Sequence, residues 1–152
     1  MVESKIKELG YELPEAPAPL ANYVTINRTR NLLFTSGSGC FKDGKPLYQG
    51  RLGEDISIEQ GYDAARITAL NLLSIVKKEV GDLNKVKKVV KLLAFVSCTN
   101  DFYDHPQVIN GASDLLVEVY GENGKHARSA IGTNVLPLNL PVEIELVLEI
   151  EE

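Results

Sequence analysis

The sequence predicts an α+β domain in which two helices cover one face of a mixed β-sheet. Three observations support this prediction. Apolar residues recur at helical spacing over residues 57–80 and again over residues 108–119. Residues 142–151 alternate between apolar and mostly acidic side chains, and short runs rich in Val, Ile, Thr, Tyr and Phe lie elsewhere in the chain. Because each helix carries one apolar stripe, the opposite face of the sheet must meet solvent or another subunit.

The N-terminal half supplies a hairpin and the first helix. "NYVTINRTRNLLFTSGSG" contains two β-prone runs around the polar "NRTRN", which predicts strands over residues 22–27 and 31–37. The next stretch, "FKDGKPLYQG", has the turn chemistry of a loop or of a second short hairpin. A helix is predicted to begin at Ser57, where Ser-Ile-Glu-Gln forms a capping box, and to end before Gly81. Its apolar stripe should pack on the sheet and consists of Tyr62, Ala65, Ala69, Leu72, Leu73, Val76 and Val80.

The C-terminal half continues with a strand, a helix and two further strands. The strand is predicted in "VKKVVKLLAFVSC". Strict alternation from "NKVKKVVKLL", residues 84–93, onward would separate two faces: Lys85, Lys87 and Lys91 on one, Val90, Leu92 and Ala94 on the other. A solvated strand face or edge is the favoured interpretation of the lysines, with an anion-binding patch as the alternative. The second helix follows "TNDFYDHP" and ends at Gly121. The last strand should place one face on the core.

Composition and charge narrow the functional classes. The 152 residues are enough for one domain spanning residues 1–152, and 44% hydrophobic with 24% charged residues is typical of a globular protein. The net charge of −5 argues against nucleic-acid binding, because phosphate recognition requires clustered Lys and Arg. No apolar run approaches the roughly 18 residues of a membrane span, so we expect no membrane association and a cytoplasmic location. Cys40 and Cys98 lack metal-ligand spacing and are predicted to be buried, free thiols.

Standard catalytic motifs are absent from the sequence. There is no Ser-His-Asp spacing, HExxH, GxGxxG or P-loop, and "TSGSGC" lacks the lysine that follows a phosphate-binding loop. His105 lies beside a proline and His126 in a turn, so a surface or capping role is favoured over acid/base catalysis for both. An enzyme with this sequence would depend on few ionisable groups, and we expect no cofactor and no metal.

Three separated segments, in the same order, resemble the RidA family, also called YjgF or L-PSP, whose members are reactive imine and enamine deaminases. "ARSAIGTNVLPLNLPVEIE" is similar to the family's A-R-S, hydrophobic strand, L-P and alternating I-E-I-E. "YVTINRTRNLLFTSG" resembles its N-terminal hairpin, and "LAFVSCTNDFYDHPQVIN" resembles the segment before its second helix. The resemblance covers about residues 23–149. It implies a chorismate-mutase-like fold and a homotrimer whose sheets form a central barrel, with active sites between neighbouring subunits.

The resemblance also implies a set of site residues and an activity. Arg128 matches the arginine that grips the substrate carboxylate, and Glu143 matches the acid near the attacking water. The implied activity is hydrolysis of small 2-aminoacrylate-like imines or enamines to 2-keto acids and ammonia. Further contacts to the substrate are implied for Tyr23, Ser36, Gly37, Asn110 and Ala130, of which the glycine and the alanine contribute backbone groups.

The chemistry of such a reaction explains a short list of residues. A guanidinium presents two parallel N–H donors that match a carboxylate, and a protonated imine is already electrophilic enough to need no covalent nucleophile. A carboxylate near Arg128 would stay ionised, which favours a base or orienting role for Glu143. Taken alone, however, Arg128 is equally compatible with pairing to an acid at a subunit interface.

Departures from the family pattern predict a divergent branch and leave other functions open. Ala130 replaces the cysteine found two residues after the arginine in many of these deaminases, and "GENGKHARS" is a longer approach than usual. One alternative is a non-catalytic trimer that binds small carboxylates in a regulatory role. The other is RNA cleavage as an endoribonuclease, against which the acidic charge argues.

Overall fold

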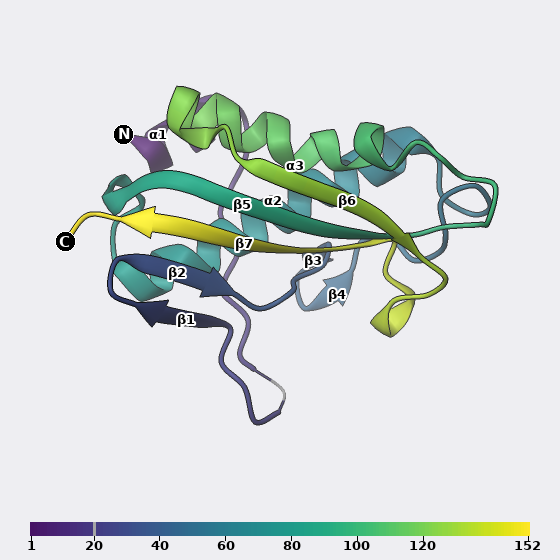
Figure 1. Ribbon diagram of the computed structural model, residues 1–152, viewed down its shortest axis with the longest axis horizontal. Coiled ribbons are helices and arrows are strands. Elements are labelled where there is room, and N and C mark those ends of the chain that lie inside the picture. The colour runs from purple at the N-terminus through teal and green to yellow at the C-terminus, as the bar shows by residue number, and fades with distance from the viewer. Residues whose placement is uncertain (20) are drawn as a thin grey trace.

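The computed structural model describes residues 1–19 and 21–152, and its main layer is a five-stranded sheet with the order β1-β2-β7-β5-β6 (Figure 1). β5 and β6 run parallel and are joined through α3, whereas the other neighbouring strands run antiparallel. α2 and α3 lie on the same face of the sheet, which confirms the α+β prediction. The elements are α1 (Val2–Glu8), β1 (Ile26–Thr29), β2 (Leu32–Thr35), β3 (Phe41–Lys42), β4 (Lys45–Pro46), α2 (Ile58–Val80), β5 (Val86–Ser97), α3 (His105–Tyr120), β6 (Ala127–Thr133) and β7 (Val142–Ile150), with short 3₁₀ turns at Leu83–Lys85, Gly121–Gly124 and Pro137–Asn139.

The two long helices begin and end where the sequence predicts. The Ser57 side chain accepts a hydrogen bond from the Gln60 amide, and the Gln60 side chain accepts one from the Ser57 amide, so the capping box is complete. Gly81, with a φ of 83°, ends α2. Every residue of the predicted α2 stripe is buried except Tyr62, which is half-buried. Where the helices cross, Gly111 permits close approach, because an added Cβ would lie 2.0 Å from the Tyr62 carbonyl oxygen.

Both hairpins form, but their strands differ from the prediction. β1 and β2 turn at Arg30 and Asn31, so most of the polar "NRTRN" lies in β1 rather than in the turn. The prediction failed here because β1 is an exposed edge strand, where polar side chains face water at little cost. "FKDGKPLYQG" contains the second hairpin, β3–β4. It turns at Asp43 and Gly44, both of which have positive φ, as in a type I′ turn.

The strict alternation predicted for β5 is wrong at its start. Register shifts occur between Val86 and Lys88 and again between Val89 and Lys91, and each shift moves the following side chains to the other face. Val89 is therefore buried and Val90 only half-buried. The lysines cover a solvated part of the strand, as the favoured interpretation expected. β7 alternates regularly, with all five of its predicted core positions buried.

The N-terminus contains an element that sequence reasoning did not assign. Val2 and Ile6 of α1 are buried, and the Val2 amide donates a 3.0 Å hydrogen bond to Asn84 Oδ1. Residues 10–18 then run along α2 without regular structure, and we call them the N-terminal strap. The Ser74 hydroxyl on α2 donates to the carbonyl of Pro14 and ties the strap to the helix.

Two further predictions are tested by the structure. Cys40 and Cys98 are buried free thiols, as expected. Within residues 1–19 and 21–152, no helix is both long and apolar enough to cross a bilayer.

Candidate functional site

Arg128 lies on β6, an edge strand of the sheet, with its side chain toward α3. It is level with Leu92 of β5, a buried core residue, and paired residues of parallel strands share a face. Its Nη1 donates to Asn110 Oδ1 at 2.9 Å and to Ser113 Oγ at 3.1 Å, both on α3. Thus Arg128 and Asn110, both predicted site residues, lie in contact.

The charge of Arg128 has no carboxylate counterpart among the described residues. Both hydrogen-bond acceptors of its Nη1 are uncharged, and within residues 1–19 and 21–152 no carboxylate oxygen lies within 4.0 Å of its guanidinium. In contrast, Arg51 faces Glu54 at 3.6 Å and Arg66 pairs with Asp63. Of these three partly buried arginines, Arg128 is the one whose charge remains uncompensated.

Four other predicted site residues gather around the start of β7. Glu143 is half-buried and packs on Gly37, where an added Cβ would lie 2.9 Å from Glu143 Cδ. The Ser36 hydroxyl donates to the Val24 carbonyl at 2.7 Å and ties the end of β2 to the segment before β1. Tyr23 in that segment is 49% exposed. Tyr23, Ser36, Gly37 and Glu143 all line one cavity.

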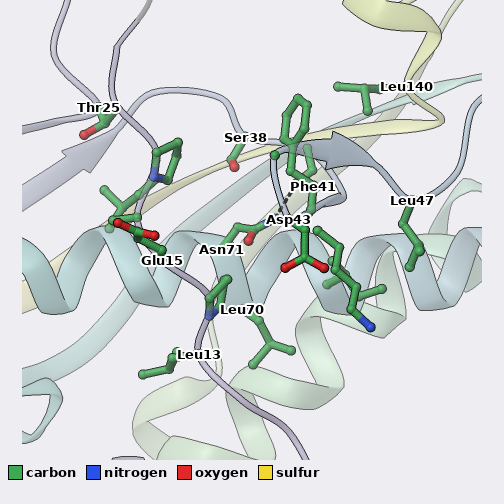
Figure 2. A pocket seen from close by; sticks show the side chains of 18 of the residues that line it. Leu13, Glu15, Thr25, Ser38, Phe41, Asp43, Leu47, Leu70, Asn71 and Leu140 are labelled. Atoms are coloured by element: carbon green, nitrogen blue, oxygen red, sulfur yellow. Dashed lines mark hydrogen bonds between the residues drawn. The ribbon is translucent and has the colours of Figure 1, made fainter.

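This cavity, of about 1080 Å³, extends far beyond the predicted residues, between the N-terminal strap, α2 and the β3–β4 hairpin (Figure 2). Asn71 of α2 is 4% exposed and its amide donates to the carbonyls of Gly39 and Phe41 at 2.9 and 3.0 Å, which fixes the segment that leads into the hairpin. Leu13 of the strap and Leu70 and Leu140 add apolar surface. The proline-rich stretch "LPEAPAP" is a sequence feature of this wall that the predictions from sequence did not use.

The side chains of one polar cluster in the cavity wall pair with one another. The Tyr48 hydroxyl donates to Asp63 Oδ2 at 2.6 Å, and this bond to an ionised carboxylate raises the pKa of Tyr48 to about 12. Asp63 also pairs with Arg66, whose guanidinium lies 4.8 Å from the centre of the Tyr11 ring. These contacts hold the N-terminal strap against α2 and leave Arg66 occupied within the wall.

Arg128 and Glu143 lie on opposite faces of the sheet. Glu143 pairs with Phe95 of β5, and Arg128 pairs with Leu92 of the same strand. Phe95 and Leu92 are three residues apart, so their side chains, and those of their partners, point to opposite faces of the sheet. The expectation that a neighbouring Arg128 keeps Glu143 ionised therefore does not apply within one protomer. Instead, burial raises the pKa of Glu143, and the nearby charge of Glu145 raises it further. One protomer does not bring the two side chains to the same ligand.

Comparison with known proteins decides the family. The sequence pattern described as "YjgF/chorismate mutase-like, putative endoribonuclease" matches residues 3–150. This chain belongs to the YjgF family. Protein TCP17 of Trypanosoma cruzi is 39% identical over 150 residues, which cover 98% of this chain and 94% of TCP17. The predicted family and the chorismate-mutase-like fold are both confirmed.

Solved structures place the chain on a divergent branch of the YjgF family. A protein from Shewanella oneidensis, described as "a putative endoribonuclease", is 37% identical, with 99% of each chain covered and a TM-score of 0.96. The yjgF gene product of E. coli is 25% identical, with 89% of this chain and 93% of that chain covered and a TM-score of 0.66. The two solved structures therefore share the fold of this chain and differ in how closely they superpose on it.

Ala130 takes the position where the family resemblance implied a cysteine. It is half-buried and shares the core-side face of β6 with Arg128, so no thiol stands next to the guanidinium on this strand. A thiol does lie further along: Cys98 Sγ is 3.3 Å from His105 Nε2, and an added Cβ at Gly132 would lie 2.9 Å from that sulfur. Burial raises the pKa of the Cys98 thiol, which favours its protonated, less nucleophilic form.

Two polar residues beside Arg128 were not predicted as site residues. Ser113 accepts from Arg128, and its Oγ lies 2.9 Å from Nε2 of His126. His126 is half-buried rather than at the surface. Their spacing in the sequence could have identified them. Ser113 follows Asn110 by three residues on a helix and His126 precedes Arg128 by two in extended chain, so each pair shares a face.

Proposed function

We propose that this protein hydrolyses small imines and enamines derived from 2-amino acids, such as 2-aminoacrylate, to 2-keto acids and ammonium. The observation that carries the proposal is the Arg128 guanidinium, which is held by two neutral acceptors and has no carboxylate within 4.0 Å in the part of the chain that the structure describes. A guanidinium fixed in this way is suited to bind the carboxylate of a small organic acid. The competing role for Arg128 is an ion pair with an acid of a neighbouring subunit, and the ligand-binding experiments below separate the two roles.

The reaction itself requires few protein groups. An enamine first takes a proton on its β-carbon and becomes the protonated imine. Water then adds to the C=NH₂⁺ carbon, a proton moves from oxygen to nitrogen, and the C–N bond breaks to give the ketone and NH₄⁺. Orientation and proton transfer are therefore the main contributions asked of the enzyme, and each is a recognised source of rate acceleration.

Glu143 is the group proposed to move the proton. Its pKa is raised by burial and by Glu145, which brings the carboxyl closer to the pH range in which it both accepts and donates a proton. The sequence favoured a base or orienting role for Glu143, and the raised pKa adds proton donation to that role. Gly37 supports the role because the absence of a side chain allows Glu143 to lie against the backbone.

The proposal includes a homotrimer, because the site is incomplete in one protomer. Arg128 lies on the helix-covered face at an edge strand, and Glu143 lies on the open face two strands away. The open face also carries exposed apolar side chains, with Phe34 43% and Ile131 48% exposed. Exposed apolar groups of this kind are typical of an association surface. A second copy packed on this face would bring its own Arg128 to the Glu143 of the first.

The activity is tested with 2-imino acids generated in situ by an amino-acid oxidase, with ammonium and keto acid as the readouts. The parent is expected to accelerate ammonium release, and Arg128→Ala to abolish the acceleration while keeping its melting temperature. Arg28→Ala is the matched control, since Arg28 lies on the exposed β1 and contacts only the Arg30 carbonyl in the described chain. Equal rates for the parent and Arg128→Ala would contradict the proposal.

The shared site is tested by mixing two inactive variants. If each site takes Arg128 from one subunit and Glu143 from the next, trimers reassembled from equal amounts of Arg128→Ala and Glu143→Gln contain a complete pair at about a quarter of their sites. Activity should therefore return to roughly a quarter of the parent level. No recovery, together with a monomeric mass by analytical ultracentrifugation, would contradict a site between subunits.

The same assays separate the two alternative functions. A 2-keto acid that raises the melting temperature without any imine turnover would indicate a non-catalytic carboxylate-binding protein. RNA cleavage, which the description of the family raises, would require binding that weakens steeply with salt. A net charge of −5 argues against that outcome.

A further inference from the structure

Ser113 and His126 form a chain of hydrogen bonds behind Arg128. Nη1 of Arg128 donates to Ser113 Oγ at 3.1 Å, Ser113 Oγ lies 2.9 Å from His126 Nε2, and His126 Nδ1 lies 2.7 Å from the Gly124 carbonyl oxygen. The three side chains come from α3, from β6 and from the segment before β6. None of the family positions implied by the sequence includes Ser113 or His126.

The direction of each hydrogen bond follows from the chemistry of its atoms. The Gly124 carbonyl only accepts, so Nδ1 of His126 carries the hydrogen. Burial lowers the pKa of His126, the hydrogen bond to Gly124 opposes this and the charge of Arg128 adds to it; the net lowering favours the neutral ring, whose Nε2 then accepts. Ser113 must then donate its single hydrogen to Nε2, which leaves its oxygen lone pairs to accept from Arg128.

The far end of this chain is anchored by packing. Gly124 is buried, and an added Cβ would lie 2.2 Å from the Leu116 carbonyl oxygen of α3. The Gly124 carbonyl is therefore fixed relative to the helix that also carries Ser113. The unusually long approach "GENGKHARS" thus has a structural role, because it brings His126 to the back of Arg128.

These contacts determine which part of the guanidinium is left for a ligand. Nη1 has two hydrogens, and Asn110 and Ser113 accept them. The remaining hydrogens are on Nη2 and Nε, which lie along one edge of the planar group and present two parallel donors. We infer that Ser113 and His126 are positioning residues that turn the Nη2–Nε edge of Arg128 toward the substrate carboxylate. This inference rests on the proposed function.

The test measures binding of pyruvate by calorimetry and imine hydrolysis for two pairs of variants. Ser113→Ala and His126→Leu each interrupt the series of hydrogen bonds behind Arg128. Each variant is expected to weaken pyruvate binding and to raise KM about tenfold, the effect of losing one hydrogen bond to a charged group. Ser113→Thr keeps the hydroxyl and His126→Gln keeps one donor and one acceptor, so both should stay within about threefold of the parent. Ser129→Ala, the matched serine control on β6, should have no effect.

Two readouts distinguish positioning from a general structural effect. Because Ser113 and His126 act through one chain, the double variant Ser113→Ala/His126→Leu should lose no more affinity than either single variant. Nitrogen NMR of the parent should show His126 neutral, with its hydrogen on Nδ1, at neutral pH. Full additivity, a hydrogen on Nε2, or parent-like pyruvate binding in Ser113→Ala would overturn the inference. Failure of the parent itself to bind pyruvate would overturn the proposed function and this inference together, whereas parent activity with unaffected variants would overturn only the inference.

Discussion

Arg128→Lys provides a quantitative test of the carboxylate site, because the hydrogens can be counted. Of the five N–H hydrogens of the Arg128 guanidinium, Asn110 and Ser113 take two, and two of the remaining three form the parallel edge. A lysine ammonium has three hydrogens. If it satisfies the same two acceptors, one hydrogen remains for the ligand, so one of two charge-assisted hydrogen bonds is lost.

The expected magnitude follows from that count. A hydrogen bond to a charged group contributes about 1.5–3 kcal/mol, which corresponds to roughly 10- to 150-fold weaker binding. Calorimetric titration of pyruvate into the parent and into Arg128→Lys measures this ratio, with Arg28→Lys as the control that should leave affinity unchanged. Arg128→Ala should bind more weakly still, because it also loses the charge. Parent-like affinity in Arg128→Lys would refute bidentate recognition by Arg128.

Three further variants test the geometry around the two halves of the site. Gly111→Ala should lower the free energy of unfolding, measured by urea titration, by about 3 kcal/mol or more, because the new Cβ would lie 2.0 Å from the rigid Tyr62 backbone. Gly61→Ala is the control: its new Cβ would meet only side-chain ends at 3.0 Å, so it should lower the free energy of unfolding by less. Gly37→Ala should reduce kcat while the protein stays folded, because its Cβ displaces the Glu143 carboxyl; an unchanged kcat would contradict the role given to that contact. In an Arg128→Ala background, in which no guanidinium from a neighbouring subunit reaches Glu143, Glu143→Gln should stabilise the fold at neutral pH, because the raised pKa of Glu143 means that ionisation costs the folded state. Below the usual carboxyl pKa Glu143 is protonated in both the folded and the unfolded state, so the gain measured by urea titration should vanish there.

The parts of the fold that were predictable are those in which local pattern and burial agree. The capping box at Ser57, the stripe that ends at Gly81 and the alternation of β7 each reflect one buried face over a regular element. β5 departed from its prediction because two register shifts depend on pairing with β7, which a single segment does not encode. The N-terminal strap was missed for a similar reason: its order depends on contacts with Arg66 and Ser74 of α2.

The site shows a comparable division. Individual residues such as Arg128 and Asn110 were identified by resemblance, and they lie in contact. Their surroundings depend on how β6 packs beside α3, so Ser113 and His126 became visible only in three dimensions. The predicted ionised state of Glu143 depends on a neighbouring Arg128; within one protomer the two side chains lie on opposite sheet faces, and burial raises the pKa of Glu143.

Because Arg128 and Glu143 lie on opposite sheet faces, each has a charge that the other does not compensate within one protomer. Arg128 is a cation held by neutral groups, so it gains from any anion that reaches its edge strand. Glu143 is a half-buried carboxyl near a second acid, so it gains from any cation or from a proton. A substrate with a carboxylate and a protonated imine carries an anion for Arg128 and a cation for Glu143, a few atoms apart. Juxtaposition of the two halves across a subunit interface would satisfy each charge with one end of such a molecule, whereas a simple dicarboxylate would leave Glu143 repelled. Pyruvate imine analogues should therefore bind more tightly than dicarboxylates of similar size, and the reverse order of affinities would argue against this pairing of charges.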